Sequence, residues 1–228
     1  LFYSRGFFIL NHKQIKFNHK QKTLILNMPK NKTLIANWQP DLPDAQVSYY
    51  QNFLSNKEAD NFFDTFFSNI PWQLDNIKLF GKIYEQPRLT SFHSKNPSNY
   101  SYSGLILRPN AMTTELLTLI KRIQTVCEHE FNCVLLNLYR DGSDSNGWHA
   151  DNEKELGVSP QIASFSLGAS RFFHFKHRKI KTERHKIELH HGSLLLMEGP
   201  MQANWLHQIP KTKKPLSPRI NLTFRKII

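Results

Sequence analysis

The second half of the chain is a succession of short strand patterns, and this feature limits the fold most. Each pattern shows the alternation or the short apolar run that is typical of a β-strand. Turns that contain glycine, such as Leu167-Gly168 and His191-Gly192, separate neighbouring patterns. Many short strands joined by such turns indicate a β-sandwich or jelly roll. We expect strands at residues 134–139, 161–167, 171–176, 186–190, 193–197 and 219–226.

Two helix patterns precede these strands. Ser55 and Glu58 form a capping box, and apolar residues at helical spacing continue to about residue 69. A second amphipathic pattern covers residues 113–130. The sequence therefore predicts an α+β, mainly β chain, with a double-stranded β-helix (jelly roll) core and flanking N-terminal helices. The stripe of the first helix that we expect in the core consists of Phe62, Phe63, Phe66 and Phe67.

A histidine and a carboxylate stand two positions apart in the middle of these strands. On an extended segment the side chains of His149 and Asp151 project from one face and converge on one point. His207 is the candidate third ligand, because two histidines and one carboxylate form the facial set that binds Fe(II) and leaves other positions open. The alternative is a solvated loop or a hydrogen-bonded core histidine.

The segment at residues 219–225 alternates polar and apolar side chains, as a strand does. It places Arg219 and Arg225 on the same face as Asn221 and Thr223. Two inward arginines need an anion, because a buried charge without a partner is costly. A dicarboxylate co-substrate would supply that partner through bidentate pairing. The alternative is an edge strand whose basic residues face water.

Four motifs follow one another in a fixed order along the chain. They are Asn137-x-Tyr139, His149-x-Asp151, His207 and Arg219-x-Asn221-x-Thr223-Phe224-Arg225. In order and spacing they resemble the AlkB family of Fe(II)/2-oxoglutarate-dependent dioxygenases, which oxidatively dealkylate nucleic acids. The resemblance covers roughly residues 75–228, and the last motif is its most specific part.

This resemblance implies an enzyme of the DNA alkylation-repair branch. Such an enzyme uses Fe(II), 2-oxoglutarate and O2 to demethylate 1-methyladenine and 3-methylcytosine in DNA, with RNA left open. The implied metal ligands are His149, Asp151 and His207. The residues implied to bind 2-oxoglutarate are Asn137, Tyr139, Arg219, Asn221 and Arg225.

Residues 75–107 are rich in aromatic and turn residues and form the expected nucleotide-recognition segment. Phe80 stands at a predicted hairpin tip, where similar repair enzymes insert a finger into the duplex. The alternative is a buried strand phenylalanine. Glu153 would favour positively charged lesions, whereas Asn152 departs from an acid that is frequent in the family and leaves lesion preference open. The expected substrate contacts are Glu153, Tyr100, Tyr102, Phe80, Lys82 and Arg88.

The formal net charge of +12 favours a polyanionic partner. Nucleic acid is the first interpretation, and an anionic membrane surface is the alternative. Two basic clusters are expected to contact phosphates, although a charge run can also be a solvated face. No apolar run approaches the roughly 20 residues that span a bilayer. The phosphate contacts that we expect are Arg178, Lys179, Lys211, Lys213 and Lys214.

Residues 1–27 carry five basic residues and no acid. We interpret them as an extension outside the native domain or a disordered basic arm, with a transit peptide as a further reading. Residues 28–228 are expected to form one dioxygenase domain that acts as a monomer. Two cysteines do not suggest a disulfide framework, so the cytoplasm or a nucleus is the expected compartment.

Two other functions remain open from the sequence. One is a 2-oxoglutarate hydroxylase of the same fold that acts on a protein or a small molecule. The other is a nucleic-acid-binding module without catalysis.

Overall fold

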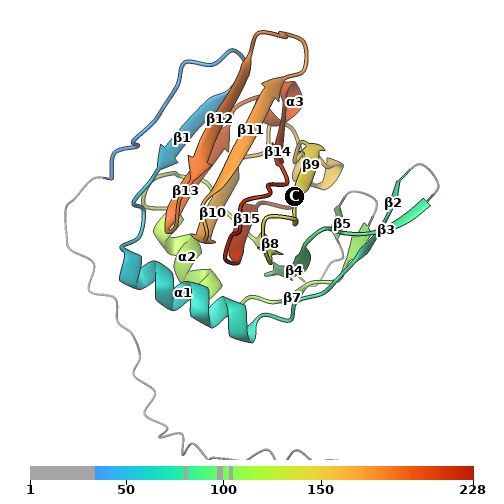
Figure 1. Cartoon of the computed structure of the whole chain (residues 1–228). Coiled ribbons are helices and arrows are strands. Elements are labelled where there is room, and N and C mark those ends of the chain that lie inside the picture. Colours follow the sequence, from blue (N-terminus) through green and yellow to red (C-terminus); the bar gives the residue numbers. More distant parts are fainter. Residues whose placement is uncertain (1–33, 80–81, 97–99, 103–104) are drawn as a thin grey trace, which may run out of the picture. The chain divides into compact units, whose positions relative to one another are not determined.

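Two facing β-sheets form the centre of the described part of the chain (Figure 1). The computed structural model describes residues 34–79, 82–96, 100–102 and 105–228. Leu34–Ile228 form one compact unit. Among the described residues, no helix has both the length and the apolar character needed to cross a membrane. The expected domain boundary after residue 27 stays a prediction.

The larger sheet, which we call the major sheet, has strands β10 (Ile162–Gly168), β15 (Arg219–Arg225) and β8 (Cys133–Tyr139) at its centre, and all their pairings are antiparallel. Its central strand β15 is buried at every position. In spatial order its strands are β1 (Gln46–Tyr50), β13 (Ser193–Glu198), β10 (Ile162–Gly168), β15 (Arg219–Arg225), β8 (Cys133–Tyr139), β4 (Leu89–Ser94) and β7 (Asn110–Ala111).

The smaller sheet, which we call the minor sheet, faces the major sheet across an apolar core. Leu135 and Met197 of the major sheet pack in one buried cluster with Phe173, Phe175 and Trp205 of the minor sheet. Two sheets that share one core in this way form the jelly roll expected from the strand patterns. The order of the minor sheet is β12 (Arg184–Leu189), β11 (Arg171–His177), β14 (Trp205–Ile209) and β9 (Asn146–His149).

Two helices cover the other face of the major sheet. Helix α1 (Asn56–Asn69) begins with the predicted capping box and ends where it was expected. In α1 only part of the phenylalanine stripe is core: Phe66 is 1% exposed, whereas Phe67 is 44% exposed. Helix α2 (Thr114–Ile123) packs in the same cluster. In Figure 1, α1 and α2 lie beside β10 and β13.

Helix α2 is shorter than the sequence pattern predicted. The helix ends at Ile123, and the N–H groups of Thr125 and Val126 donate to carbonyls three residues back. Such tight bonds are typical of a helix terminus. The chain then turns so that buried Phe131 and Cys133 can enter the core and β8. The apolar period continues past the last helical turn, which explains the error.

The segment at 75–107 contributes two separate hairpins and one strand of the major sheet. Strands β2 (Asn76–Leu79) and β3 (Lys82–Glu85) pair with each other, as do β5 (Tyr100–Tyr102) and β6 (Leu105–Leu107). Phe80 lies outside the described residues. Only the backbone is described for Lys82, Tyr100 and Tyr102, so the substrate contacts expected of these side chains stay predictions.

Two short helices complete the described chain. They are η1 (Lys154–Leu156), a 3-10 turn, and α3 (Met201–Asn204), which leads into β14.

Candidate metal centre

His149, Asp151 and His207 meet between the two sheets. His149 ends β9 and stands opposite His207 of β14 in the strand register. The two imidazole rings are 4.3 Å apart between centroids, and His149 Nε2 lies 3.8 Å from Asp151 Oδ1. One ligand atom of each residue lies within 4.8 Å of the others. The backbone therefore brings together the three residues that the sequence proposed as ligands.

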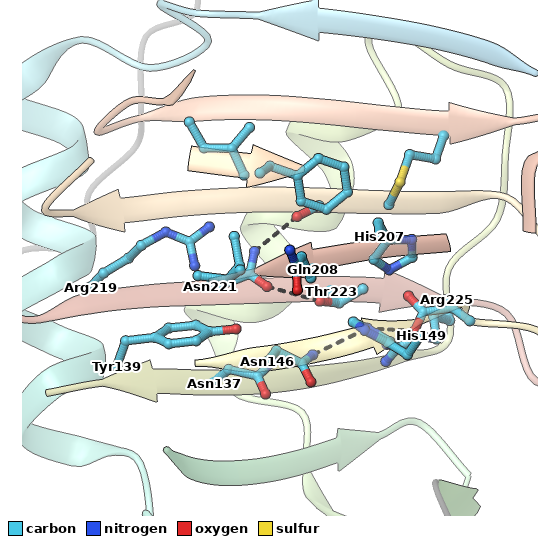
Figure 2. Close-up of a pocket in the computed structure, with 16 residues that line it drawn as sticks. Asn137, Tyr139, Asn146, His149, His207, Gln208, Arg219, Asn221, Thr223 and Arg225 are labelled. Atoms are coloured by element: carbon cyan, nitrogen blue, oxygen red, sulfur yellow. Dashed lines mark hydrogen bonds and ion pairs between the residues drawn. The ribbon is translucent and has the colours of Figure 1, made fainter. Parts of the chain in front are cut away.

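Hydrogen bonds orient the His149 side chain and hold the backbone at Asp151. Nδ1 of His149 donates to the Gly147 carbonyl at 2.8 Å, which leaves the lone pair on Nε2. Nδ2 of Asn146 donates to that Nε2 at 3.1 Å (Figure 2). The Asp151 amide donates to Gln202 Oε1 at 3.0 Å. Buried Nδ1 of His207 has no hydrogen-bond partner among the described residues.

The charge states in the cluster suit a divalent cation. Burial would raise the pKa of Asp151, but the guanidinium of Arg225, 3.0 Å from its Oδ1, and the two histidines hold it at about 2. Burial lowers the pKa of His207 to about 3, helped by His149. At neutral pH the cluster therefore offers a carboxylate and a neutral imidazole, the forms that ligate metals. Two nitrogens and one oxygen are the donor set of the facial Fe(II) site.

A slot for an anion lies beside this cluster, on the inward face of β15. Arg219 is 1% exposed, and its Nη2 donates to Ser166 at 2.9 Å. Its Nε and Nη1 are buried and have no hydrogen-bond partner among the described residues. Burial lowers the pKa of Arg219 to about 10, so the group remains charged at neutral pH. A buried cation with two idle donors fits a carboxylate ligand.

Strand β8 supplies the other wall of this slot. Tyr139 stands opposite Arg219 in the strand register, and Asn137 stands opposite Asn221. The Arg219 guanidinium lies 5.2 Å from the centre of the Tyr139 ring. Figure 2 shows these side chains on one side of the pocket and the histidines on the other. The alternative of an edge strand with arginines in water is wrong, because β15 is central and buried.

The slot and the cluster line one pocket. All the residues proposed from the sequence as metal or 2-oxoglutarate ligands line it. They are Asn137, Tyr139, His149, Asp151, His207, Arg219, Asn221 and Arg225.

One expected substrate contact needs correction. Arg88 was expected to contact phosphate, but its side chain is only 4% exposed. Its Nε donates to Asn137 Oδ1 at 2.7 Å, and its Nη1 donates to the Ser145 carbonyl at 3.3 Å. An arginine occupied by buried acceptors is not available to a surface polyanion. Arg88 instead orients Asn137 in the wall of the pocket.

The remaining substrate-side residues keep their expected roles as predictions. Glu153 is partly buried and directly precedes η1. The residues of both basic clusters are exposed, in the loop after β11 and in the loop after β14. They are Arg178, Lys179, Lys211, Lys213 and Lys214.

Several residues of the site were missed from the sequence. Neither Asn146 nor Gln202 belonged to a pattern recognised in the sequence. Arg171 is buried and donates to the carbonyls of Asp141, Asp144 and Pro210 at 3.1, 2.8 and 2.6 Å. It thereby ties the loop before β9 to the loop after β14. The only sequence signal was an arginine at the buried start of a strand.

The fold and the donor set together define a 2-oxoglutarate/Fe(II) oxygenase. The family model described as the 2OG-Fe(II) oxygenase superfamily matches residues 46–225. The structure titled "The structure of OsALKBH1" is similar in fold, with a TM-score of 0.57 and 16% identity. That similarity covers 82% of this chain and 100% of that chain.

Two groups of relatives are similar in sequence. The human "Alpha-ketoglutarate-dependent dioxygenase alkB homolog 3" is 40% identical over 192 residues, which are 80% of this chain and 66% of the relative. The "DNA oxidative demethylase ALKBH2" of Mus musculus is 36% identical over 189 residues, 78% of this chain and 79% of the relative. The chain thus spans slightly less than two thirds of the alkB homolog 3 proteins. It belongs to the AlkB family of 2-oxoglutarate-dependent dioxygenases.

Proposed function

We propose that the protein is an Fe(II)/2-oxoglutarate-dependent demethylase of N-alkylated bases, 1-methyladenine and 3-methylcytosine, in nucleic acid, and that it serves DNA repair. The observation that carries the proposal is the facial ligand set beside a buried Arg219, two of whose donors have no partner in the part of the chain that the structure describes. Relatives named as DNA oxidative demethylases support the choice of substrate.

The residues of the pocket have separate tasks in this proposal. His149, Asp151 and His207 would hold Fe(II), and Arg219 would pair with the carboxylate of 2-oxoglutarate that lies away from the metal. Tyr139 and Asn221 line the slot on either side of that guanidinium. Asn137, which Arg88 orients, would donate to the co-substrate from β8. Arg225 neutralises Asp151 and closes the metal end of the slot.

Fe(II) held by His149, Asp151 and His207 would supply oxygen activation, with 2-oxoglutarate as the co-substrate that is converted to succinate and CO2. One oxygen atom enters the N-methyl group, and the resulting hydroxymethyl group leaves as formaldehyde with restoration of the base. Glu153 would favour a cationic methylated base over a neutral one, because opposite charges attract strongly in a partly dry pocket.

The test is the yield of formaldehyde from oligonucleotides that contain 1-methyladenine or 3-methylcytosine. Single-stranded and duplex forms, with and without Fe(II) and 2-oxoglutarate, give the substrate form and the cofactor requirement together. We expect formaldehyde only when both are present, and none from His207→Ala. Conversion of 2-oxoglutarate to succinate without demethylation would instead favour a hydroxylase that acts on a protein or a small molecule.

We also propose that the chain works as a monomer in the cytoplasm or a nucleus. Cys127 and Cys133 are both free thiols, which suits a reducing compartment. Sedimentation of the purified chain would test the oligomeric state.

A further inference from the structure

The outer face of the minor sheet carries exposed aromatic and basic side chains. Trp148 of β9 is 40% exposed and Phe172 of β11 is 41% exposed. Lone exposed aromatic residues are common and need no explanation. Here, however, each ring lies under a lysine. We call Trp148, Phe172, His174, Lys176 and Lys186 the outer platform.

Ring contacts show that these residues share one face. Lys176 Nζ lies 4.3 Å from the centre of the Trp148 ring, although strand β14 separates β11 from β9. Lys186 Nζ lies 5.3 Å from the centre of the Phe172 ring. The rings of Phe172 and His174 are 6.5 Å apart. Their neighbours Phe173 and Phe175 are buried between the sheets, so the outer platform faces away from the core.

The charge around the outer platform is strongly positive. Arg184, opposite Lys176 in the register, is exposed, and so are Arg178, Lys179 and Lys181 in the loop that follows β11. The nearby acids are Glu188, opposite Phe172, and Glu183, which pairs with His185 at 2.8 Å. Basic residues interleaved with aromatic rings are the features that bind single-stranded nucleic acids.

We propose that the outer platform binds single-stranded nucleic acid next to the modified nucleotide, with bases stacked on Trp148 and Phe172 and phosphates on Lys176 and Lys186. The inference rests on the proposed function, because it takes a nucleic-acid strand as the substrate. It extends that function by specifying the form of the substrate.

The spacing of the two rings favours a single strand. Strands β9 and β11 are two strand spacings apart, about 10 Å. Stacked bases of a duplex follow one another at about 3.4 Å, and their faces are covered by their neighbours. Rings so far apart can therefore stack only on bases that are separated from each other, as in a single strand.

The position of Trp148 connects the outer platform to the pocket. Trp148 directly precedes His149, and the two side chains point to opposite faces of β9. Strand β9 is the edge of the minor sheet. A nucleic-acid strand with one base in the pocket can thus pass around this edge and continue onto the outer face.

The lysines now above the rings would move when a base binds. An exposed cation–π contact is weaker than the stacking of a base on an aromatic ring. Exchange of the ammonium group for a base is therefore favourable, and the released ammonium group can pair with a phosphate beside that base.

The experiment measures binding without catalysis. Fluorescence anisotropy of the full chain, without Fe(II) and 2-oxoglutarate, gives the affinity for unmodified dT12, rU12 and a 12-base-pair duplex. The double variant Trp148→Ala/Phe172→Ala should bind both single strands about tenfold or more weakly, with a change of less than about twofold for the duplex. The dT12 and rU12 arms distinguish DNA from RNA as the preferred strand.

Three further variants keep the test decisive if the alanine pair folds poorly. Trp148→Phe/Phe172→Tyr retains both rings and should bind dT12 as the wild type does. Lys176→Ala/Lys186→Ala should reduce the slope of log K against log salt by about 1.4 for a single strand. The matched control Phe67→Ala/Lys57→Ala removes an exposed ring and a lysine from α1 and should leave binding unchanged.

The inference is overturned if the alanine pair binds dT12 and rU12 within twofold of the wild type, or if the control pair loses as much. It is also overturned if the ring-retaining pair binds as weakly as the alanine pair. Binding to dT12 through the rings, without formaldehyde release from any methylated oligonucleotide, would uphold the outer platform and reject the demethylase proposal.

Discussion

At the scale of single residues, Arg219 is the side chain whose surroundings depend most on a ligand. It is buried and charged; its Nη2 donates to Ser166, whereas its Nε and Nη1 have no hydrogen-bond partner among the described residues. Burial of a charge with so little compensation is destabilising in the free protein. A ligand carboxylate that pairs with the Arg219 guanidinium would offset this destabilisation. We therefore expect Arg219 to contribute to ligand binding and not to the stability of the free protein.

Replacing Arg219 by methionine should weaken the binding of 2-oxoglutarate without lowering the stability of the free protein. In Arg219→Met, the Michaelis constant for 2-oxoglutarate should rise at least about tenfold, because charged hydrogen bonds contribute about 1.5–3 kcal/mol each. The free energy of unfolding without ligand should not fall, because an apolar side chain replaces a buried charge. Steady-state kinetics and denaturant titration measure the two effects. The variant Arg219→Lys keeps the charge without the fork and should bind 2-oxoglutarate with intermediate affinity. Wild-type affinity in Arg219→Met would contradict the assignment.

The buried thiol of Cys133 gives a prediction about pH. Burial raises the pKa of Cys133 from 9.0 to about 11. The unfolded thiol ionises near pH 9 while the folded thiol stays neutral. The folded state therefore binds more protons, and stability falls as the pH rises from about 9 to 11. Denaturant titration across this range should show the loss, and Cys133→Ala should make the curve flatter. An unchanged pH dependence in Cys133→Ala would show that another group causes it.

At the scale of elements, the pairing of β9 with β14 sets the metal centre. Each strand carries one histidine, and a loop adjoins each strand: residues 140–145 before β9 and 210–214 after β14. Arg171 joins these loops through three carbonyls. A Cβ atom at Gly142 would lie 2.6 Å from the Thr212 carbonyl oxygen, so the loops are also in close backbone contact. The distance between the histidines therefore depends on loops outside the pocket.

Removal of the Arg171 hydrogen bonds should weaken metal binding from a distance. In Arg171→Met, three carbonyls lose their donor, and we expect a loss of about 2–4 kcal/mol in the free energy of unfolding. Affinity for Mn²⁺ should fall about tenfold, because β9 and β14 are less well held together. Calorimetry measures the affinity, and substitution of the exposed Lys121 of α2, Lys121→Met, is the control. Wild-type affinity in an otherwise destabilised protein would mean that β-strand pairing alone positions the ligands.

The sequence predicted these elements unevenly. The six expected strands lie within two residues of observed ones, because alternation of polar and apolar residues and short apolar runs are local properties of the sequence. Strands β9 and β14 were not identified as strands, since β9 has only four residues with a glycine among them and β14 has five. The two-residue spacing of His149 and Asp151 predicted their convergence. The contacts of Arg88, Arg171 and Gln202 follow from pairings between distant segments, which leave no local pattern.

At the scale of the whole molecule, the two sheets differ in what covers them. Helices α1 and α2 bury the outer face of the major sheet, so that sheet provides a rigid scaffold. The minor sheet contributes two metal ligands on its inner face and exposed rings on its outer face. Binding of metal and co-substrate between the sheets should therefore stabilise the whole compact unit, because both sheets supply ligands.

Thermal unfolding tests this coupling. Mn²⁺ with 2-oxoglutarate, each at about 100 times its dissociation constant, should add about 2.7 kcal/mol per independent ligand. For a unit of this size each kcal/mol raises Tm by about 2–4 °C, so the shift should be about 10 °C or more. Addition of a chelator should reverse it. In His207→Ala the part of the shift that Mn²⁺ contributes should be absent, and a full shift there would place the metal elsewhere.

The ion pair between Arg225 and Asp151 has a consequence for how the site accepts a metal ion. The arginine stands in for the positive charge that iron would bring, so the carboxylate stays ionised and in place when no ion is bound. A metal ion can therefore bind without a change in the ionisation state of Asp151.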